Sequence, residues 1–149
     1  MVRPGTTVRP GTSGDRFAVI DLLRQSHAAA GYTFLFEAAR ADALYRLHLD
    51  NPAACALVLE RDGHVCGLLL ASAFDHPFGA GLMAKETVWF IAPAARGRCA
   101  LAMLDAYEAW AKSIGCVAIG MAALATNDVS RLYIRRGYAP AETHFIKSI

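Results

Sequence analysis

The sequence predicts a mixed α/β fold, in which helices cover both faces of a mostly antiparallel sheet. Two observations support this prediction. Two segments with helical apolar spacing precede three consecutive strand-like segments, and the remaining strands then alternate with helices. The 149 residues are 55% hydrophobic with a net charge of +2, which excludes a disordered chain and suits a single domain over residues 1–149. Residues 1–6 are expected to be a flexible tail.

The predicted element order is β-α-α-β-β-β-α-β-α-β. In chain order we expect a strand at 7–9, helices at 15–30 and 37–49, strands at 55–61, 64–74 and 86–92, a helix at 98–114, a strand at 116–124, a short helix at 127–136, and a last strand at 138–146.

The first two helices are predicted from their ends and their apolar spacing. Thr12 and Asp15 resemble a capping box, and Gly31 suits the left-handed end of a helix. Asn51-Pro52 stops the second helix, because the residue before proline avoids helical geometry. The faces expected to pack on the sheet are Phe17, Ile20, Leu23 and His27 in the first helix, and Ala41, Leu44, Tyr45 and His48 in the second.

The later elements are separated by turn residues. Asp62-Gly63 is a hairpin signal between two apolar strands, and a Gly/Pro/His loop is expected over 75–84. Pro93 ends the third strand. Gly115 and Gly137 are expected to end the two later helices. The long helix has its apolar face at Leu101, Leu104, Tyr107, Ala111 and Ile114.

Several function classes are excluded or disfavoured. The near-neutral charge argues against nucleic acid as the main partner, and no apolar run is long enough to span a membrane. The four cysteines form no Cys-x-x-Cys pair, so free thiols in a cytoplasmic protein are expected, with no metal site. Residues 79–84 match a dinucleotide-binding expression, but they do not connect a strand to a helix.

The segment after Pro93 is a candidate anion site. A buried strand ends there, an Arg96-Gly97-Arg98 turn follows, and a long helix begins. Free N–H groups and the positive dipole end of that helix would face one point, and Gly97 would let a ligand approach the backbone. The alternative is an ordinary strand-to-helix turn with solvated arginines. We refer to residues 96–101 as the anion loop.

Two segments carry a family resemblance. Residues 93–98, Pro-Ala-Ala-Arg-Gly-Arg, resemble motif A of the GNAT superfamily of N-acetyltransferases. Residues 127–138, with Asn127, Leu132-Tyr133 and Gly137-Tyr138, resemble its motif B. The spacing and element order also match over roughly residues 7–146. The carboxyl end further resembles short phage or prophage members of the superfamily.

The chain departs from motif A at two positions. The family pattern expects small residues at 99 and 101, where this chain has Cys99 and Leu101. Either they crowd the backbone amides that would hold the CoA pyrophosphate, or they point into the core and leave the amides free. Cys99 itself has two interpretations. It is a small residue packed inward, or a reactive thiol at a helix N-terminus that acetyl-CoA acylates or that forms a mixed disulfide with CoA.

The resemblance implies a direct transfer of acetyl from acetyl-CoA to a primary amine. Tyr133 matches the general acid, because a phenol stays protonated at neutral pH; the alternative is a core tyrosine on a short helix. A backbone N–H near Ile91 matches the oxyanion donor. Asn127 is either a helix cap or a CoA contact. The implied cofactor-binding set is Ile91, Arg96, Gly97, Arg98, Cys99, Ala100, Leu101 and Asn127.

Other roles are open. Glu86 is the preferred general base; a solvated strand-end glutamate is the alternative, and Asp75, His76 and His144 are weaker base candidates. The aromatics Tyr32, Phe34 and Phe36 line the acceptor pocket or belong to the core. The acceptor is expected to be a small-molecule or peptide amine. The rival functions are a weakly active or inactive CoA-binding module and an interaction protein that forms a homodimer through a sheet edge.

Overall fold

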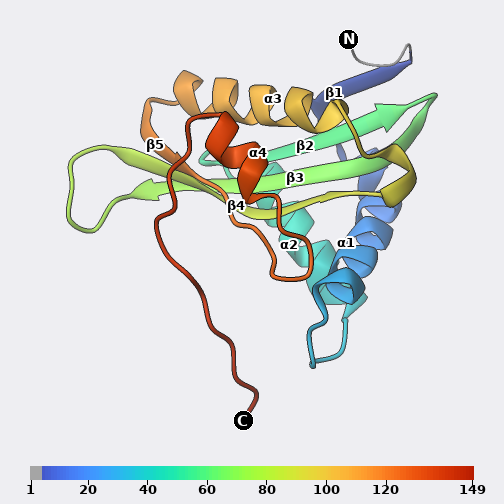
Figure 1. The fold of residues 1–149 in the computed structure, drawn as a ribbon. Helices are drawn as coiled ribbons and strands as arrows, with labels where there is room; N and C mark the ends of the chain where they lie inside the picture. The colour runs from blue at the N-terminus through green and yellow to red at the C-terminus, as the bar shows by residue number, and fades with distance from the viewer. Residues whose placement is uncertain (1–4) are drawn as a thin grey trace.

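The protein forms a five-stranded sheet with helices on both faces (Figure 1), here described from a computed structural model for residues 5–149. The strand order is β1-β2-β3-β4-β5; all neighbouring strands are antiparallel except β4 and β5, which are parallel. The predicted mixed sheet is therefore confirmed. The elements are β1 (Thr6–Pro10), α1 (Arg16–Ala30), α2 (Ala38–Asp50), β2 (Ala54–Arg61), β3 (His64–Asp75), β4 (Leu82–Ile91), α3 (Cys99–Ser113), β5 (Cys116–Gly120) and α4 (Ser130–Arg135).

Alternate side chains of the central strands pack into two separate apolar cores, one on each face of the sheet. On one face, Leu57 and Leu69 pack with Met103 and Tyr107 of α3. On the other face, strand residues such as Leu68 pack with side chains of α1 and α2. Because side chains alternate across a strand, the continuous apolar run of β3 serves both cores at once.

The ends of α1 follow the predicted chemistry. Asp15 Oδ2 accepts from the Thr12 N–H at 2.8 Å, and Gly31 ends the helix with φ 71°. The packed face is wrong at one position, since Phe17 is 78% exposed. Val19 and Leu22 are buried together with Leu23, which was predicted correctly. Their i, i+3, i+4 spacing forms a narrower contact face that turns Phe17 toward solvent.

Two boundaries on the β4 side of the sheet differ from the prediction. Strand β4 begins at Leu82, where the prediction had a loop, because residues 82–85 pair with both β3 and β5. Strand β5 ends at Gly120 rather than at 124. The pairing between β4 and β5 stops at Lys85 and Gly120, so the two strands diverge beyond that point.

The last predicted strand does not form. No strand or helix is present over residues 138–149, which run away from the sheet (Figure 1). Pro140 has no N–H to donate to a ladder. The tail is held by side chains instead, with Lys85 Nζ donating to Glu142 at 3.1 Å and the hydroxyls of Thr33 and Ser148 2.6 Å apart.

Residues 1–4 of the expected flexible tail lie outside the described residues. Thr6 already belongs to β1 and pairs with Arg61 of β2.

Candidate active site

A bulge in β4 sets up the site. Leu70 of β3 pairs with Val88, but the next residue, Ala71, pairs with Glu86, so Thr87 is the extra residue. A bulge breaks the alternation of side chains, which puts Glu86 and Trp89 on the same face although they are three residues apart. His48 of α2 holds this bulge, because its Nε2 lies 2.9 Å from the Thr87 hydroxyl.

The two predicted catalytic residues meet at one backbone residue. The Ala122 N–H, just after β5, donates to Glu86 Oε1 at 3.0 Å. The Tyr133 hydroxyl, on α4, donates to the Ala122 carbonyl at 2.7 Å. Ala122 thus links two side chains that lie 47 positions apart in the sequence, at the opening between β4 and β5.

Burial changes the acid–base properties of both groups. It raises the pKa of the Glu86 carboxyl, and the Ala122 N–H and Lys85 oppose this shift only in part. Burial also raises the pKa of the Tyr133 phenol, with the Glu86 charge adding to the effect. A carboxyl with a raised pKa is a stronger proton acceptor when ionised, and Tyr133 stays protonated throughout the neutral range.

The anion loop presents backbone donors at the start of α3. The Ala100 and Leu101 N–H groups bond to Gly97 and Arg98 carbonyls. Within residues 5–149, the N–H groups of Gly97, Arg98 and Cys99 donate no hydrogen bond to the backbone. Gly97 has φ 134° and open space beside its Cα, so an anion can approach these three donors closely.

The two departures from the expected small residues behave differently. Cys99 is 4% exposed, and its Sγ donates to the Ala95 carbonyl at 2.9 Å, so the side chain points into the core under α3. Leu101 is 39% exposed, not part of the buried face predicted for it. The burial of Cys99 fits the inward interpretation of that residue, and the Cys99 side chain does not cover the free amides.

The two arginines of the loop also differ. Arg96 is tied to the sheet, because its Nε donates to the Ile91 carbonyl at 2.9 Å and its guanidinium lies over the Phe90 ring. Arg98 is exposed and is free to contact a ligand.

The Ile91 N–H is the predicted oxyanion donor. Its neighbour Ala92 donates its backbone N–H to the Cys66 carbonyl of β3. By strand alternation the Ile91 N–H is therefore directed to the other side of β4, where β5 has diverged.

Asn127 does not cap α4. The helix begins at Ser130, and Asp128 Oδ1 accepts from the Ser130 N–H at 2.9 Å. Asn127 donates its backbone N–H to Leu124 in the loop before the helix and is exposed. The cap interpretation is wrong because the helix starts three residues later than predicted.

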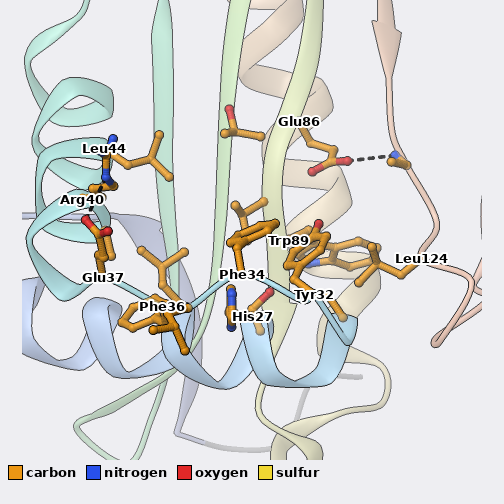
Figure 2. A pocket seen from close by; sticks show the side chains of 18 residues that line it. His27, Tyr32, Phe34, Phe36, Glu37, Arg40, Leu44, Glu86, Trp89 and Leu124 are labelled. Carbon is orange, nitrogen blue, oxygen red and sulfur yellow. Dashed lines mark hydrogen bonds and ion pairs between the residues drawn. The ribbon is translucent and has the colours of Figure 1, made fainter. Parts of the chain in front are cut away.

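A cleft of about 810 Å³ opens beside Glu86. We call it the aromatic cleft. Its walls come from α1, the connection 31–37, α2, residues 86–89 of β4 and the segment after β5, and Figure 2 shows the side chains that line it. The lining includes the three aromatics predicted for an acceptor pocket, Tyr32, Phe34 and Phe36, which meet Glu86 in one cavity.

Sequence reasoning missed four residues of this site. Two buried nitrogens that line the cleft, His27 Nε2 and Trp89 Nε1, have no hydrogen-bond partner within the described residues. Thr87 forms the bulge, and Ala122 joins Glu86 to Tyr133. Only His27 carried a sequence signal, its position on the apolar face of α1.

The weaker base candidates lie elsewhere. His76 packs on Phe78 in the β3–β4 loop, and Asp75 ends β3 beside it. His144 lies in the tail, 3.0 Å from Glu142. None of the three lines the cleft. In the described part of the chain, no group of three or more potential metal-ligating side chains occurs, and no helix is long and apolar enough to cross a membrane.

The fold is shared with many solved structures. A predicted acetyltransferase with acetyl-CoA from Clostridium acetobutylicum superimposes with a TM-score of 0.80 at 15% identity, covering 96% of each chain. A ribosomal-protein-alanine N-acetyltransferase from Brucella melitensis biovar Abortus 2308 has a TM-score of 0.77 at 18% identity, covering 97% of this chain and 99% of its own.

A glucosamine-6-phosphate N-acetyltransferase from Arabidopsis thaliana also shares the fold, with a TM-score of 0.75 at 14% identity, covering 96% of this chain and 97% of its own. No match was found among curated proteins. The family model described as "Acetyltransferase (GNAT) family" matches residues 19–138. The chain therefore belongs to the GNAT acetyltransferase family.

Proposed function

We propose that this protein is an N-acetyltransferase that moves an acetyl group from acetyl-CoA directly to a primary amine of a small molecule or peptide. The observation that carries the proposal is the arrangement around Ala122. Glu86, a carboxylate suited to accept a proton, and Tyr133, a phenol suited to donate one, lie on either side of a single peptide residue. The cleft opens directly beside Glu86.

The anion loop fits the pyrophosphate of acetyl-CoA. The amides of Gly97, Arg98 and Cys99 would bind phosphate oxygens at the start of a 15-residue helix, and Arg98 would add its charge. Arg96 would hold the loop against β4 through the Ile91 carbonyl. When bound, acetyl-CoA supplies the reactive thioester, and the family generally uses it.

Each remaining residue has one task. The Glu86 carboxylate takes a proton from the ammonium form of the acceptor, directly or through water. The Ile91 N–H, on the open side of β4, offers a donor to negative charge that develops on oxygen. Tyr133 keeps a proton on its phenol oxygen for a departing thiolate. Its hydrogen bond to the Ala122 carbonyl orients the hydroxyl at the opening between the strands.

The proposal is tested in two steps. Acetyl-CoA should raise the melting temperature of the purified protein, and thiol release should then rise with at least one amine in a panel. The rival function, a CoA-binding or interaction module without catalysis, predicts no thiol release with any amine. A protein whose melting temperature acetyl-CoA does not change would contradict both CoA binding and the enzyme.

A further inference from the structure

The aromatic cleft indicates the class of acceptor, an inference that rests on the proposed function. Its lining is mainly apolar, and the connection between α1 and α2 contributes most of the rings. Phe34 is 59% exposed and Leu35 is 89% exposed. Large apolar side chains gathered at the rim of a cavity typically mark a ligand-binding surface.

The rings form a collar around His27. The ring centroids of Tyr32, Phe34 and Phe36 lie 5.5, 5.2 and 5.7 Å from that of His27. Tyr32 and Phe34 stack on each other at 4.9 Å. Such a collar offers both faces and edges of aromatic rings, which is the surface that another aromatic ring prefers to contact.

The charges of the cleft favour a cationic amine over a phosphorylated one. Arg40 is the single lysine or arginine among the residues that line it, and its Nε donates to Glu37 Oε2 at 2.8 Å. Glu86 adds a second carboxylate. Arg24, which lies over the Phe36 ring, is not part of this lining. Within residues 5–149, the lining thus offers no unpaired lysine or arginine to a phosphate, whereas an ammonium group would meet Glu86.

The unpartnered imidazole supplies a polar contact away from Glu86. In the view of Figure 2, the rings of Phe34 and Trp89 lie between the Glu86 carboxylate and His27. His27 Nε2 is buried without a partner within residues 5–149. A buried polar atom without a partner is costly, so a ligand that offers a hydrogen bond there gains affinity.

We infer that the acceptor is an aryl-alkyl primary amine, with its amino group at Glu86, its ring in the collar of Tyr32, Phe34 and Phe36, and a polar ring substituent at His27. A peptide N-terminus and an aminosugar phosphate are the competing acceptors. The peptide N-terminus lacks the ring that the collar would contact, and the aminosugar phosphate carries a phosphate that no unpaired lysine or arginine of the lining would meet.

The test compares five amine acceptors that differ in ring, charge and size. Thiol release is measured with phenylethylamine, its ring-hydroxylated analogue, butylamine, glucosamine 6-phosphate and a short peptide that begins with alanine. Phenylethylamine should exceed butylamine in kcat/KM by about tenfold or more. The hydroxylated analogue should gain about a further fivefold, the worth of one hydrogen bond. A higher kcat/KM for the peptide or the aminosugar phosphate would overturn the inference and leave the proposed function standing.

Matched variants tie these preferences to the cleft. Phe34→Ala should bring the ratio of phenylethylamine to butylamine close to one. Phe78→Ala, which removes an exposed phenylalanine from the β3–β4 loop, should leave the ratio unchanged. His27→Phe should abolish the preference for the hydroxylated analogue while keeping the preference for an aromatic ring. An unchanged ratio in Phe34→Ala would contradict the inference.

A direct measurement of phenylethylamine binding distinguishes failure of the acceptor inference from failure of the proposed acetyltransferase function. If no amine is turned over, titration calorimetry with phenylethylamine still decides the acceptor class. Saturable binding that Phe34→Ala weakens and Phe78→Ala does not would support the inference even for an inactive protein. No binding of the aromatic amine would overturn it, whatever acetyl-CoA does.

Discussion

The anion loop and the aromatic cleft are built in opposite ways. The loop is one continuous segment of six residues, and its donors are backbone N–H groups at a helix start. The cleft is assembled from α1, α2, β4, the connection 31–37 and the segment after β5, and its chemistry comes from side chains. A loop of backbone donors should tolerate changes in side-chain type, because a side chain such as that of Cys99 can point away from the amides. In the proposed function, by contrast, the side chains of the cleft themselves contact the acceptor.

This difference predicts where substitutions act. Changes in the cleft and at the Ala122 junction should alter kcat or acceptor choice. Changes in the loop should alter the apparent affinity for acetyl-CoA only when they change its backbone. The predictions below test this contrast from the largest expected effect to the smallest.

Tyr133→Phe should produce the largest loss. It removes the proton donor, so kcat should fall by about a hundredfold in the thiol-release assay. The loss of the hydroxyl bond to Ala122 should also lower the free energy of unfolding by about 1 kcal/mol. Tyr138→Phe is the matched control, because its hydroxyl donates to Glu108 and its ring lies 5.7 Å from that of Tyr133. Equal kcat values for the two variants would remove Tyr133 from the chemistry.

Glu86→Gln should lower kcat/KM by about ten- to a hundredfold, because the amide still accepts the Ala122 N–H but takes no proton. In the wild type, kcat/KM should rise with pH above the ordinary range for a carboxyl, since burial raises the pKa of Glu86. This limb of the pH profile should vanish in the variant. A wild-type limb that survives the substitution would assign the base to another group.

The same substitution should stabilise the fold. A raised carboxyl pKa means that the folded state binds the proton more tightly than the unfolded state, so stability falls as pH rises through that range. Glu86→Gln removes this penalty. Its melting temperature should exceed that of the wild type at neutral pH, and the gap should close as the pH falls.

Gly97→Ala should weaken acetyl-CoA binding with a smaller effect on kcat. At φ 134° a Cβ strains the backbone by roughly 1–3 kcal/mol, which displaces the free amides, and KM for acetyl-CoA should rise about tenfold. Gly115→Ala, at φ 85° beyond the other end of α3, carries a similar strain away from the loop. Both variants should have lower melting temperatures than the wild type. If Gly115→Ala also raised KM for acetyl-CoA, the affinity for acetyl-CoA would depend on overall stability and not on the loop.

Cys99→Ala should have the smallest effect. The thiol is buried against the Ala95 carbonyl, so its removal should cost about 1 kcal/mol of stability and leave KM and kcat essentially unchanged. Intact mass after incubation with acetyl-CoA should show no acetyl adduct on the wild-type thiol. An adduct at Cys99 would restore the reactive interpretation of this residue.

Local patterns determined much of the fold. Apolar spacing identified the three longer helices, Gly137 marked the end of α4, turn residues separated helices from strands, and Arg96-Gly97-Arg98 marked the start of α3. These features depend on neighbours within a few residues, which a sequence displays directly. The predicted strand at 138–146 failed because a strand also needs a partner, and apolar pattern alone does not show whether a sheet edge will receive it.

The sequence by itself determined the sheet class and the helix start that carries the anion loop, and it offered Glu86 and, through the family resemblance, Tyr133 as candidate catalytic residues. Only the tertiary structure decided that these two residues share Ala122, that a bulge at Thr87 aligns Glu86 with Trp89, and that His27 lies inside an aromatic collar. The physical reason is that strand register, the divergence of β4 and β5, and the packing of α1 against the connection 31–37 depend on contacts between distant segments.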